Sequence, residues 1–179
     1  MKNKTSLLLL NLIFWTTILF SIESKAGVIA VLDVDQIIKE SYAMRDIQAK
    51  ITKKQDEYQK EVSEKQDKLE KEQKKIESKK SILSQEAFEK ESENFDKKID
   101  ELKTFVDKKQ NSLKKASMEA MSKVNDKIKS IITQIAKEKG YEIIIPSSQT
   151  LHYNDELEIT SEVLSRLNKS IKKVEVKFE

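Results

Sequence analysis

The stretch KQDKLEKEQKKIESKKSIL, residues 65–83, carries very few apolar side chains in a long run of charged ones. The four apolar residues are Leu69, Ile76, Ile82 and Leu83. The stretch lies inside a longer segment, Gln36 to Lys139, that has neither glycine nor proline, the residues that most readily end a helix. The sequence therefore predicts long helices. Because one rod of this length would extend about 150 Å, we expect it to fold back on itself.

The turn between the two helices is expected near residues 78–87. Ser78, Ser81 and Ser84 can cap a helix there, and Glu86 would place an acid in the first turn of the returning helix. The two arms would then cover about 36–80 and 86–139, each about 70 to 80 Å long. Gly140 can take the left-handed conformation that ends a helix. The sequence thus predicts an antiparallel helical hairpin over residues 36–139.

Both ends of the chain have a different pattern, typical of short strands. Residues 28–34 form a β-branched run, after which Asp33 or Asp35 can cap a helix, and YEIIIP at 141–146 and TLHY at 150–153 are predicted strands. Thr160 can cap a short amphipathic helix. The tail KKVEVKFE, residues 172–179, alternates strictly and is either a last strand or disordered. Residues 27–35 and 140–179 are therefore predicted to form one β-rich body with a short helix.

The predicted fold class is α+β, mostly α: a long antiparallel, coiled-coil-like hairpin on a small β-rich body. A sheet of three or four strands with one short helix buries too little surface to be stable alone, so we expect the body to join several subunits. The candidates for the body core and the subunit contacts are Val28, Ile29, Val31, Leu32, Ile143, Ile144 and Leu151.

Residues 1–26 are predicted to be a cleaved secretory signal peptide. Lys2 and Lys4 precede an apolar run from Leu7 to Phe20, and small residues at Ser24 and Ala26 suit a cleavage site. The alternative is an uncleaved membrane anchor, although the run is shorter than the ~20 apolar residues of a spanning helix. The chain has no cysteine, which excludes disulfides and thiol chemistry. An exported chain of this kind needs another source of stability, such as assembly.

The sparse apolar stripe of the hairpin allows two interpretations. Charge runs usually belong to a solvated coiled-coil spacer, whose helices are supported by acid–base pairs four residues apart. Alternatively, lightly packed arms enclose an apolar guest through many weak contacts. The predicted acid–base pairs are Asp56/Lys60, Glu61/Lys65, Glu64/Lys68, Asp67/Lys71 and Glu70/Lys74. The candidate guest-facing stripe, for which packing within the chain is the alternative, is Tyr58, Val62, Leu69, Ile76, Leu83, Phe88 and Phe95.

Enzymatic chemistry is not expected. Two glycines cannot form a phosphate-binding loop, and His152, the single histidine, has no cysteine or histidine partner for a metal site or a triad. The acidic residues are interleaved with lysines, whereas a catalytic carboxylate pair needs a dry cleft. Removing residues 1–26, with three lysines and one glutamate, lowers the net charge from +3 to +1, which disfavours a nucleic-acid binder. We therefore expect no catalysis, cofactor, metal, nucleotide or nucleic acid.

The sequence resembles the Skp (OmpH-like) family of periplasmic chaperones at both of its ends. The segments that carry the resemblance are GVIAVLDVDQIIKES at 27–41 and IAKEKGYEIIIPSSQTLHYNDELEITSEVLSRLN at 135–168. The resemblance covers essentially the whole mature chain. It implies a homotrimer in the periplasm whose hairpins surround a cavity and hold unfolded outer-membrane proteins, without ATP, until they insert.

The resemblance also allows transient contact with a membrane surface as a further interaction. Well-known members are strongly basic, whereas this mature chain is nearly neutral, which weakens the expectation of lipopolysaccharide binding. The competing interpretation is a structural spacer or scaffold of the cell envelope. A periplasmic efflux adaptor, which needs substantial β domains on both sides of its hairpin, is a weaker third alternative.

Overall fold

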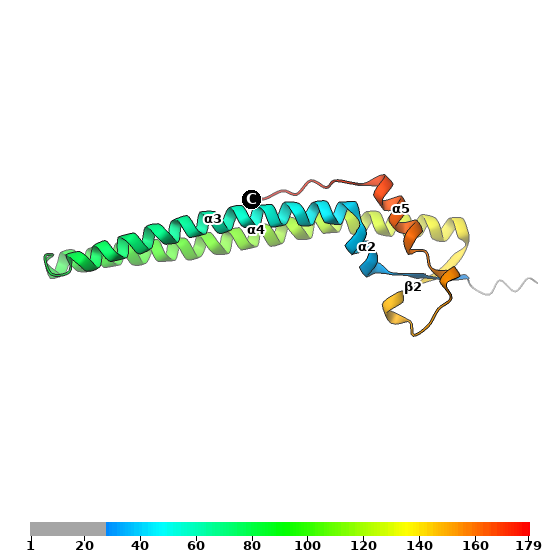
Figure 1. Ribbon diagram of the computed structural model, residues 1–179, viewed down its shortest axis with the longest axis horizontal. Helices are drawn as coiled ribbons and strands as arrows, with labels where there is room; N and C mark the ends of the chain where they lie inside the picture. The colour runs from blue at the N-terminus through cyan, green and yellow to red at the C-terminus, as the bar shows by residue number, and fades with distance from the viewer. Residues whose placement is uncertain (1–27) are drawn as a thin grey trace, which may run out of the picture.

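The structure is a computed structural model that describes residues 28–179. A long helical hairpin projects from a small body at one end of the molecule (Figure 1). The predicted fold class, mostly α with a small β part, is confirmed. The signal peptide predicted for residues 1–26 lies outside the described residues.

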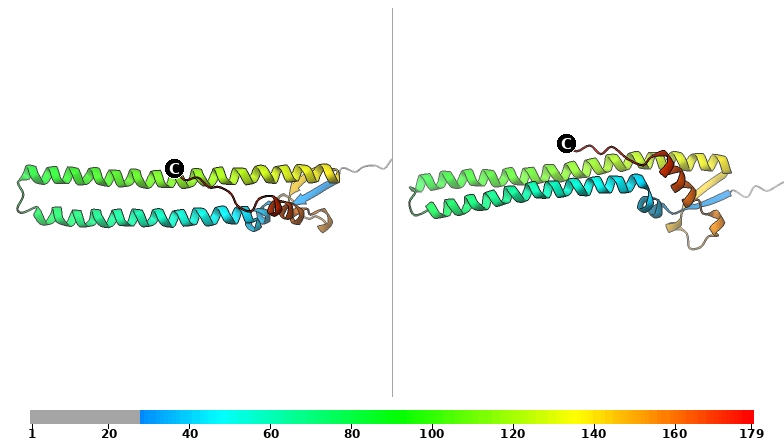
Figure 2. Two further views of the ribbon diagram at one scale, coloured as in Figure 1. Left: turned by 90° about the horizontal axis from the view of Figure 1, so that it is seen from above. Right: turned by 45° about the horizontal axis from the view of Figure 1, so that its top comes forward.

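Two helices form the hairpin, α3 (Tyr42–Lys79) and α4 (Gln85–Lys139). They run side by side along the length of α3, and the last turns of α4 continue past the start of α3 in both views of Figure 2. The hydroxyl of Ser84 accepts a hydrogen bond from the Ala87 amide at 3.3 Å and caps the start of α4. Gly140 ends α4 with φ 74°, a conformation that costs other residues about 1 kcal/mol or more. Serine and glycine therefore set the two ends of α4.

A short helix, α2 (Val34–Glu40), precedes the hairpin. Asp33 caps α2, because its Oδ1 accepts a hydrogen bond from the Gln36 amide at 2.8 Å. The sequence predicted one continuous helix from residue 36, and this was wrong. The chain breaks at buried Ser41, whose backbone is extended and whose hydroxyl accepts from the Met44 amide at 3.1 Å. A serine side chain can replace a helical backbone bond in this way, so it allows a bend without glycine or proline.

The sheet has two parallel strands, β1 (Val28–Leu32) and β2 (Tyr141–Pro146). Ile29 pairs with Ile143 and Ala30 with Ile144. The prediction of a third strand at 150–153 was wrong. The chain instead forms a 3₁₀ turn, η1 (Ser147–Gln149), followed by an irregular segment. Val31 of β1 forms one isolated bridge with Glu158. Within residues 28–179 the sheet is therefore smaller than the three or four strands expected.

Helix α5 (Thr160–Ser170) packs against α4 and α2 at the base of the hairpin. It follows the 3₁₀ turn η2 (Asp155–Leu157). Thr160 was predicted to cap α5, but the cap position is Ile159. The Thr160 hydroxyl instead accepts a hydrogen bond from the Asp33 amide at 2.8 Å and so joins α5 to the end of β1. One core results, formed by Ala30, Leu32, Ile37, Ala43, Met44, Ile47, Ala120, Val124, Ile128, Ile131, Ile135, Ile159, Val163, Leu167 and Val174.

The last residues of the chain, 171–179, are extended but do not join the sheet. They leave α5 and run back along the hairpin (Figure 2). Neither alternative offered by the sequence describes them, because side chains of α3 and α4, and not a neighbouring strand, bind their backbone.

Candidate functional site

The interior of the hairpin changes along its length. Near the body, α3 and α4 contribute to one closed core together with β1, α2 and α5, and in it Ile47, Val124 and Ile135 have no exposed surface. This region, α3 from Tyr42 to about residue 57 with α4 from about residue 112 to Lys139, is called the root. Toward the turn most apolar side chains are only partly buried, Tyr58 and Ile76 being the buried ones, and hollows open between the helices. That region is called the tip.

The predicted guest-facing stripe lies along the facing sides of the two helices. Tyr58 and Ile76 are 5% and 9% exposed, and the other five residues, Val62, Leu69, Leu83, Phe88 and Phe95, are half-buried. Two of the hollows bring stripe residues together. Tyr58 and Val62 line one with Val106 and Leu113, while Leu69 and Phe95 line another with Ile99 and Leu102. In the single chain the stripe thus packs against the opposite helix while leaving apolar surface open.

Aromatic rings and lysines alternate across the middle of the hairpin. The Lys109 ammonium lies 4.2 Å from the centroid of the Tyr58 ring and 5.0 Å from that of Phe105. Lys54 lies 5.1 Å from Tyr58, and Lys65 lies 4.8 Å from Phe105. Each such contact contributes about 0.5 to 1 kcal/mol at an exposed site. We call Lys54, Tyr58, Lys109, Phe105 and Lys65 the cation–π ladder.

This ladder was not predicted from the sequence, where Tyr58 was assigned to the apolar stripe and the lysines to the solvated charges. The helical spacing of Lys54, Tyr58 and Lys65 contained part of the signal. The partners Phe105 and Lys109 come from the other helix, and their register against α3 cannot be read from either helix alone.

Ion pairs also cross between the two helices of the hairpin. Lys79 pairs with Glu91 at 3.0 Å, Lys109 with Glu61 at 3.5 Å, and Lys98 with Glu72. Of the five predicted pairs within α3, the structure contains Glu70/Lys74, at 2.5 Å. Lys74 lowers the pKa of Glu70 through this hydrogen bond, and Glu70 raises the pKa of Lys74.

The other four predicted pairs, Asp56/Lys60, Glu61/Lys65, Glu64/Lys68 and Asp67/Lys71, are not within ion-pair distance in the described part of the chain. Glu61 pairs instead with Lys109, and Lys65 lies over Phe105. For Glu61 and Lys65, groups on the opposite helix therefore replace the predicted partner. The prediction of this pair failed because it treated α3 as isolated.

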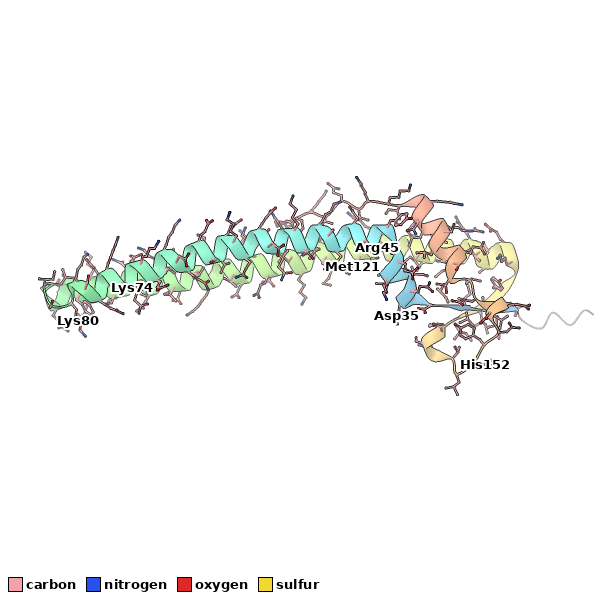
Figure 3. All side chains as sticks on the ribbon, in the orientation of Figure 1. Asp35, Arg45, Lys74, Lys80, Met121 and His152 are labelled. Atoms are coloured by element: carbon pink, nitrogen blue, oxygen red, sulfur yellow. The ribbon has the colours of Figure 1, made fainter. Side chains whose placement is uncertain are left out.

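Lysines line the hollow nearest the turn. Lys68, Lys71, Lys75, Lys79 and Lys98 surround it together with Ile76, Glu72, Glu91 and Asn94. Figure 3 shows long charged side chains over the whole hairpin, with Lys74 and Lys80 close to its end. The tip therefore combines a narrow apolar interior with a charged rim.

The predicted body residues divide into two groups. Val31 and Leu32 are buried within the chain, and Ile144 is half-buried against the core. Ile29, Ile143 and Leu151 are exposed instead. Val28 pairs with Tyr141 at the start of the sheet. Of the predicted body residues whose burial the structure describes, these three leave apolar surface exposed in the single chain.

A second group of exposed apolar residues lies beside the body and was not predicted from the sequence. Val34, Ile38 and Tyr42 lie four residues apart along α2 and the start of α3, and each is 40–50% exposed. The four-residue spacing was visible in the sequence. Their exposure was not, because an amphipathic helix does not reveal which of its neighbours lie within the same chain.

The described residues hold no cluster of three or more potential metal ligands. His152 is exposed on the body, apart from the hairpin (Figure 3). None of the helices in residues 28–179 combines the length and apolar character of a membrane span.

Comparisons with known proteins agree with this architecture. Residues 28–167 match the family model described as outer membrane protein (OmpH-like). An uncharacterized protein of Aquifex aeolicus (strain VF5) is 33% identical over 147 residues, which cover 78% of this chain and 85% of that protein. The crystal structure of a protein from Caulobacter crescentus CB15, described as an OmpH-like outer membrane chaperone, superimposes with a TM-score of 0.79. It is 17% identical, and the match covers 86% of this chain and 90% of that one. The chain belongs to the OmpH-like outer membrane protein family.

Proposed function

We propose that this protein is an ATP-independent holdase chaperone of the periplasm, which binds unfolded outer-membrane proteins between helical arms and prevents their aggregation before insertion. Membership of the OmpH-like family supports a chaperone role. The observation that carries the rest of the proposal is the contrast inside the hairpin. The root is a closed core, whereas the tip keeps half-buried Val62, Leu69 and Phe95 beside open hollows. Such an interior offers an unfolded chain many weak apolar contacts without one specific site.

The proposal includes a homotrimer joined through the body, residues 27–35 and 140–179, with the hairpin of residues 36–139 as the arm. Ile29, Ile143 and Leu151 supply exposed apolar surface for that contact, and Val34, Ile38 and Tyr42 extend it. Apolar groups of this kind on the surface of a small domain usually mark an interaction site. Three hairpins around one axis would enclose the space for the client.

The test is a mass measurement of the purified mature chain with and without a urea-diluted outer-membrane barrel protein. A stable trimer that takes up one unfolded chain and keeps it out of aggregates supports the proposal. A monomer, or a trimer that leaves the aggregation of the client unchanged, contradicts it. Changing Leu69, Ile76 and Phe95 together to serine should weaken the suppression of aggregation, while the matched change Ser63→Ala on the exposed side of α3 should leave it intact.

One observation favours a second function, a structural spacer or scaffold of the cell envelope. Three ion pairs and the cation–π ladder join α3 to α4 in the single chain, which suits a rod that stays closed. The same mass measurement separates the two proposals, because a spacer forms a monomer or an extended filament and ignores the unfolded client.

A further inference from the structure

The tail, residues 171–179, lies on a surface made by both helices of the hairpin. All of the tail lies beyond the region that matches the family model, which ends at residue 167. The contacts come from Asp46, Lys50 and Lys54 of α3 and from Ser112 and Lys115 of α4. We call these five side chains the tail-binding surface. It lies at the root and reaches the level at which the tip begins.

The surface binds the backbone of the tail through side chains. The Val174 amide donates to Asp46 Oδ2 at 2.9 Å, and Lys50 Nζ donates to the Val174 carbonyl oxygen at 2.7 Å. Lys50 also pairs with Asp46 at 2.7 Å, so one charged pair satisfies both polar groups of one residue. Further along, the Glu179 amide donates to Ser112 Oγ at 3.0 Å. Backbone recognition of this kind does not depend on the sequence that is bound.

Side chains of the tail supply the selectivity. Val174 is buried, and Val176 and Phe178 are half-buried, whereas the intervening Glu175 and Lys177 are exposed. Lys54 lies 5.8 Å from the centroid of the Phe178 ring, so the cation–π ladder continues into the tail. The surface therefore fits an extended segment whose apolar residues alternate with polar ones.

We propose that the tail-binding surface is a second client-binding site, specific for extended segments with alternating apolar residues, and that the tail is its built-in competitor. Strands of outer-membrane barrels have this alternation, so the site fits the clients proposed above; it rests on that proposed function. Because the tail is tethered, its effective concentration at the surface is in the millimolar range, so it excludes weak ligands. A ligand that makes additional contacts elsewhere on the hairpin can still displace it. Clients that also engage the tip would then displace the tail, and short unrelated peptides would not.

The test uses a fluorescein-labelled peptide with the sequence of residues 172–179 and the full-length chain. In one variant, Val174→Ser with Phe178→Ser, the resident tail loses its apolar anchors. A second variant, Phe178→Ser with Glu179→Lys, leaves buried Val174 and the tail-binding surface unchanged and makes the tail repel Lys115, in case the first does not fold. Both should bind the peptide at least about tenfold more tightly than the unaltered chain. A control peptide, KVVFKEKE, has the same composition without the alternation and should bind weakly.

A reversible lock supplies the matched control. Ser112 Oγ lies 3.0 Å from the Glu179 backbone nitrogen, so the two positions are neighbours in space, and cysteines introduced at both are designed to form a disulfide on oxidation. The chain has no other cysteine. The oxidised form of the variant Ser112→Cys/Glu179→Cys should bind no peptide, because its tail cannot leave the surface. The reduced form of the same variant, whose tail can dissociate, should bind the peptide again. Asp46→Ala, added to the releasing variant, should weaken peptide binding about tenfold, since it removes a charged backbone acceptor.

Equal peptide binding by the locked and the released chains would overturn the inference. So would a released variant that keeps its helix content and still suppresses client aggregation but does not bind the peptide; in that case the proposed holdase function stands. A third outcome is that release of the tail increases peptide binding, but neither the unaltered chain nor any variant binds an unfolded client. That outcome would overturn the proposed function and leave only a peptide-binding site.

Discussion

The root and the tip of the hairpin are built from the same two helices but are stabilised differently. At the root, fully buried aliphatic side chains such as Ile47 and Val124 fill the interface. At the tip, partly buried side chains, lysine–aromatic contacts and exposed ion pairs hold the helices together. Buried apolar groups contribute several times more stability than exposed ion pairs. The hairpin should therefore open from its tip while its root stays closed, which is what an arm that admits an unfolded chain needs.

The sharpest test of this contrast removes apolar volume at the root. Changing fully buried Ile135 to alanine should lower the free energy of unfolding by about 2 to 5 kcal/mol, because it leaves a cavity in a closed core. The matched control is Ile82→Ala at the turn, where the side chain is 79% exposed and the loss should be within about 0.5 kcal/mol. Urea unfolding followed by circular dichroism measures both. Similar losses at the two positions would abolish the distinction between root and tip.

A smaller effect is expected from the cation–π ladder. Lys109→Met keeps the length of the side chain but removes the charge between Tyr58 and Phe105, and two such contacts contribute about 1 to 2 kcal/mol. Hydrogen exchange at the tip should become faster, while amides at the root keep their protection.

The control for this change is Lys103→Met, whose ammonium pairs with Asp100 in the same helix. This control variant should leave the rate of hydrogen exchange at the tip unchanged. Equal rates of hydrogen exchange at the tip in the two variants would mean that the cation–π ladder does not hold α3 and α4 together.

Acid should loosen the tail before it affects the core of the root. The hydrogen bond from Lys50 lowers the pKa of Asp46, burial opposes this effect, and the Val174 amide lowers the pKa further. A depressed pKa means that Asp46 contributes stability above its ordinary value of about 4, and that this contribution is lost as the pH falls through the lowered value. The NMR signal of the Val174 amide should titrate in that acidic range.

The variant Asp46→Asn checks that assignment, because it removes the titrating group and keeps an acceptor oxygen. Its Val174 amide signal should no longer change in the acidic range before unfolding. A titration that persists unchanged in the variant would mean that another group controls the tail.

The smallest effect is expected for an exposed ion pair at the tip. Glu72→Lys places two like charges opposite each other and should lower the stability by no more than about 1 kcal/mol at low salt. Adding Lys98→Glu should restore the loss, and high salt should remove the difference between the variants. Thermal unfolding at two salt concentrations measures this. A loss as large as that of Ile135→Ala would show that charges, and not burial, control the hairpin.

Much of the fold followed from local signals. The absence of glycine and proline from residues 36–139 predicted the long helices, and Ser84, Asp33 and Gly140 each occupy an end that their chemistry suits. Local signals failed where two segments compete for one group. Thr160 binds the Asp33 amide rather than capping its own helix, and Glu61 binds Lys109 across the hairpin rather than Lys65 along it.

The candidate site was less accessible from the sequence than the fold. The stripe residues were predicted as a set, but their division into buried Tyr58 and Ile76 and half-buried Leu69 and Phe95 depends on the packing of α4 against α3. Their role in client binding remains a prediction. The tail-binding surface gave no signal, because its five side chains belong to three turns of α3 and one of α4 that only meet in the folded hairpin.

The sequence by itself determined the two long arms, the helix ends at Asp33, Ser84 and Gly140, and the two strands, because capping, helix propensity and β-branching act between neighbours along the chain. Only the tertiary structure decided how far each side chain is covered, which charges meet, and where the tail lies. Those properties depend on the register of α4 against α3, and that register is fixed by the packing of the whole root rather than by any one segment.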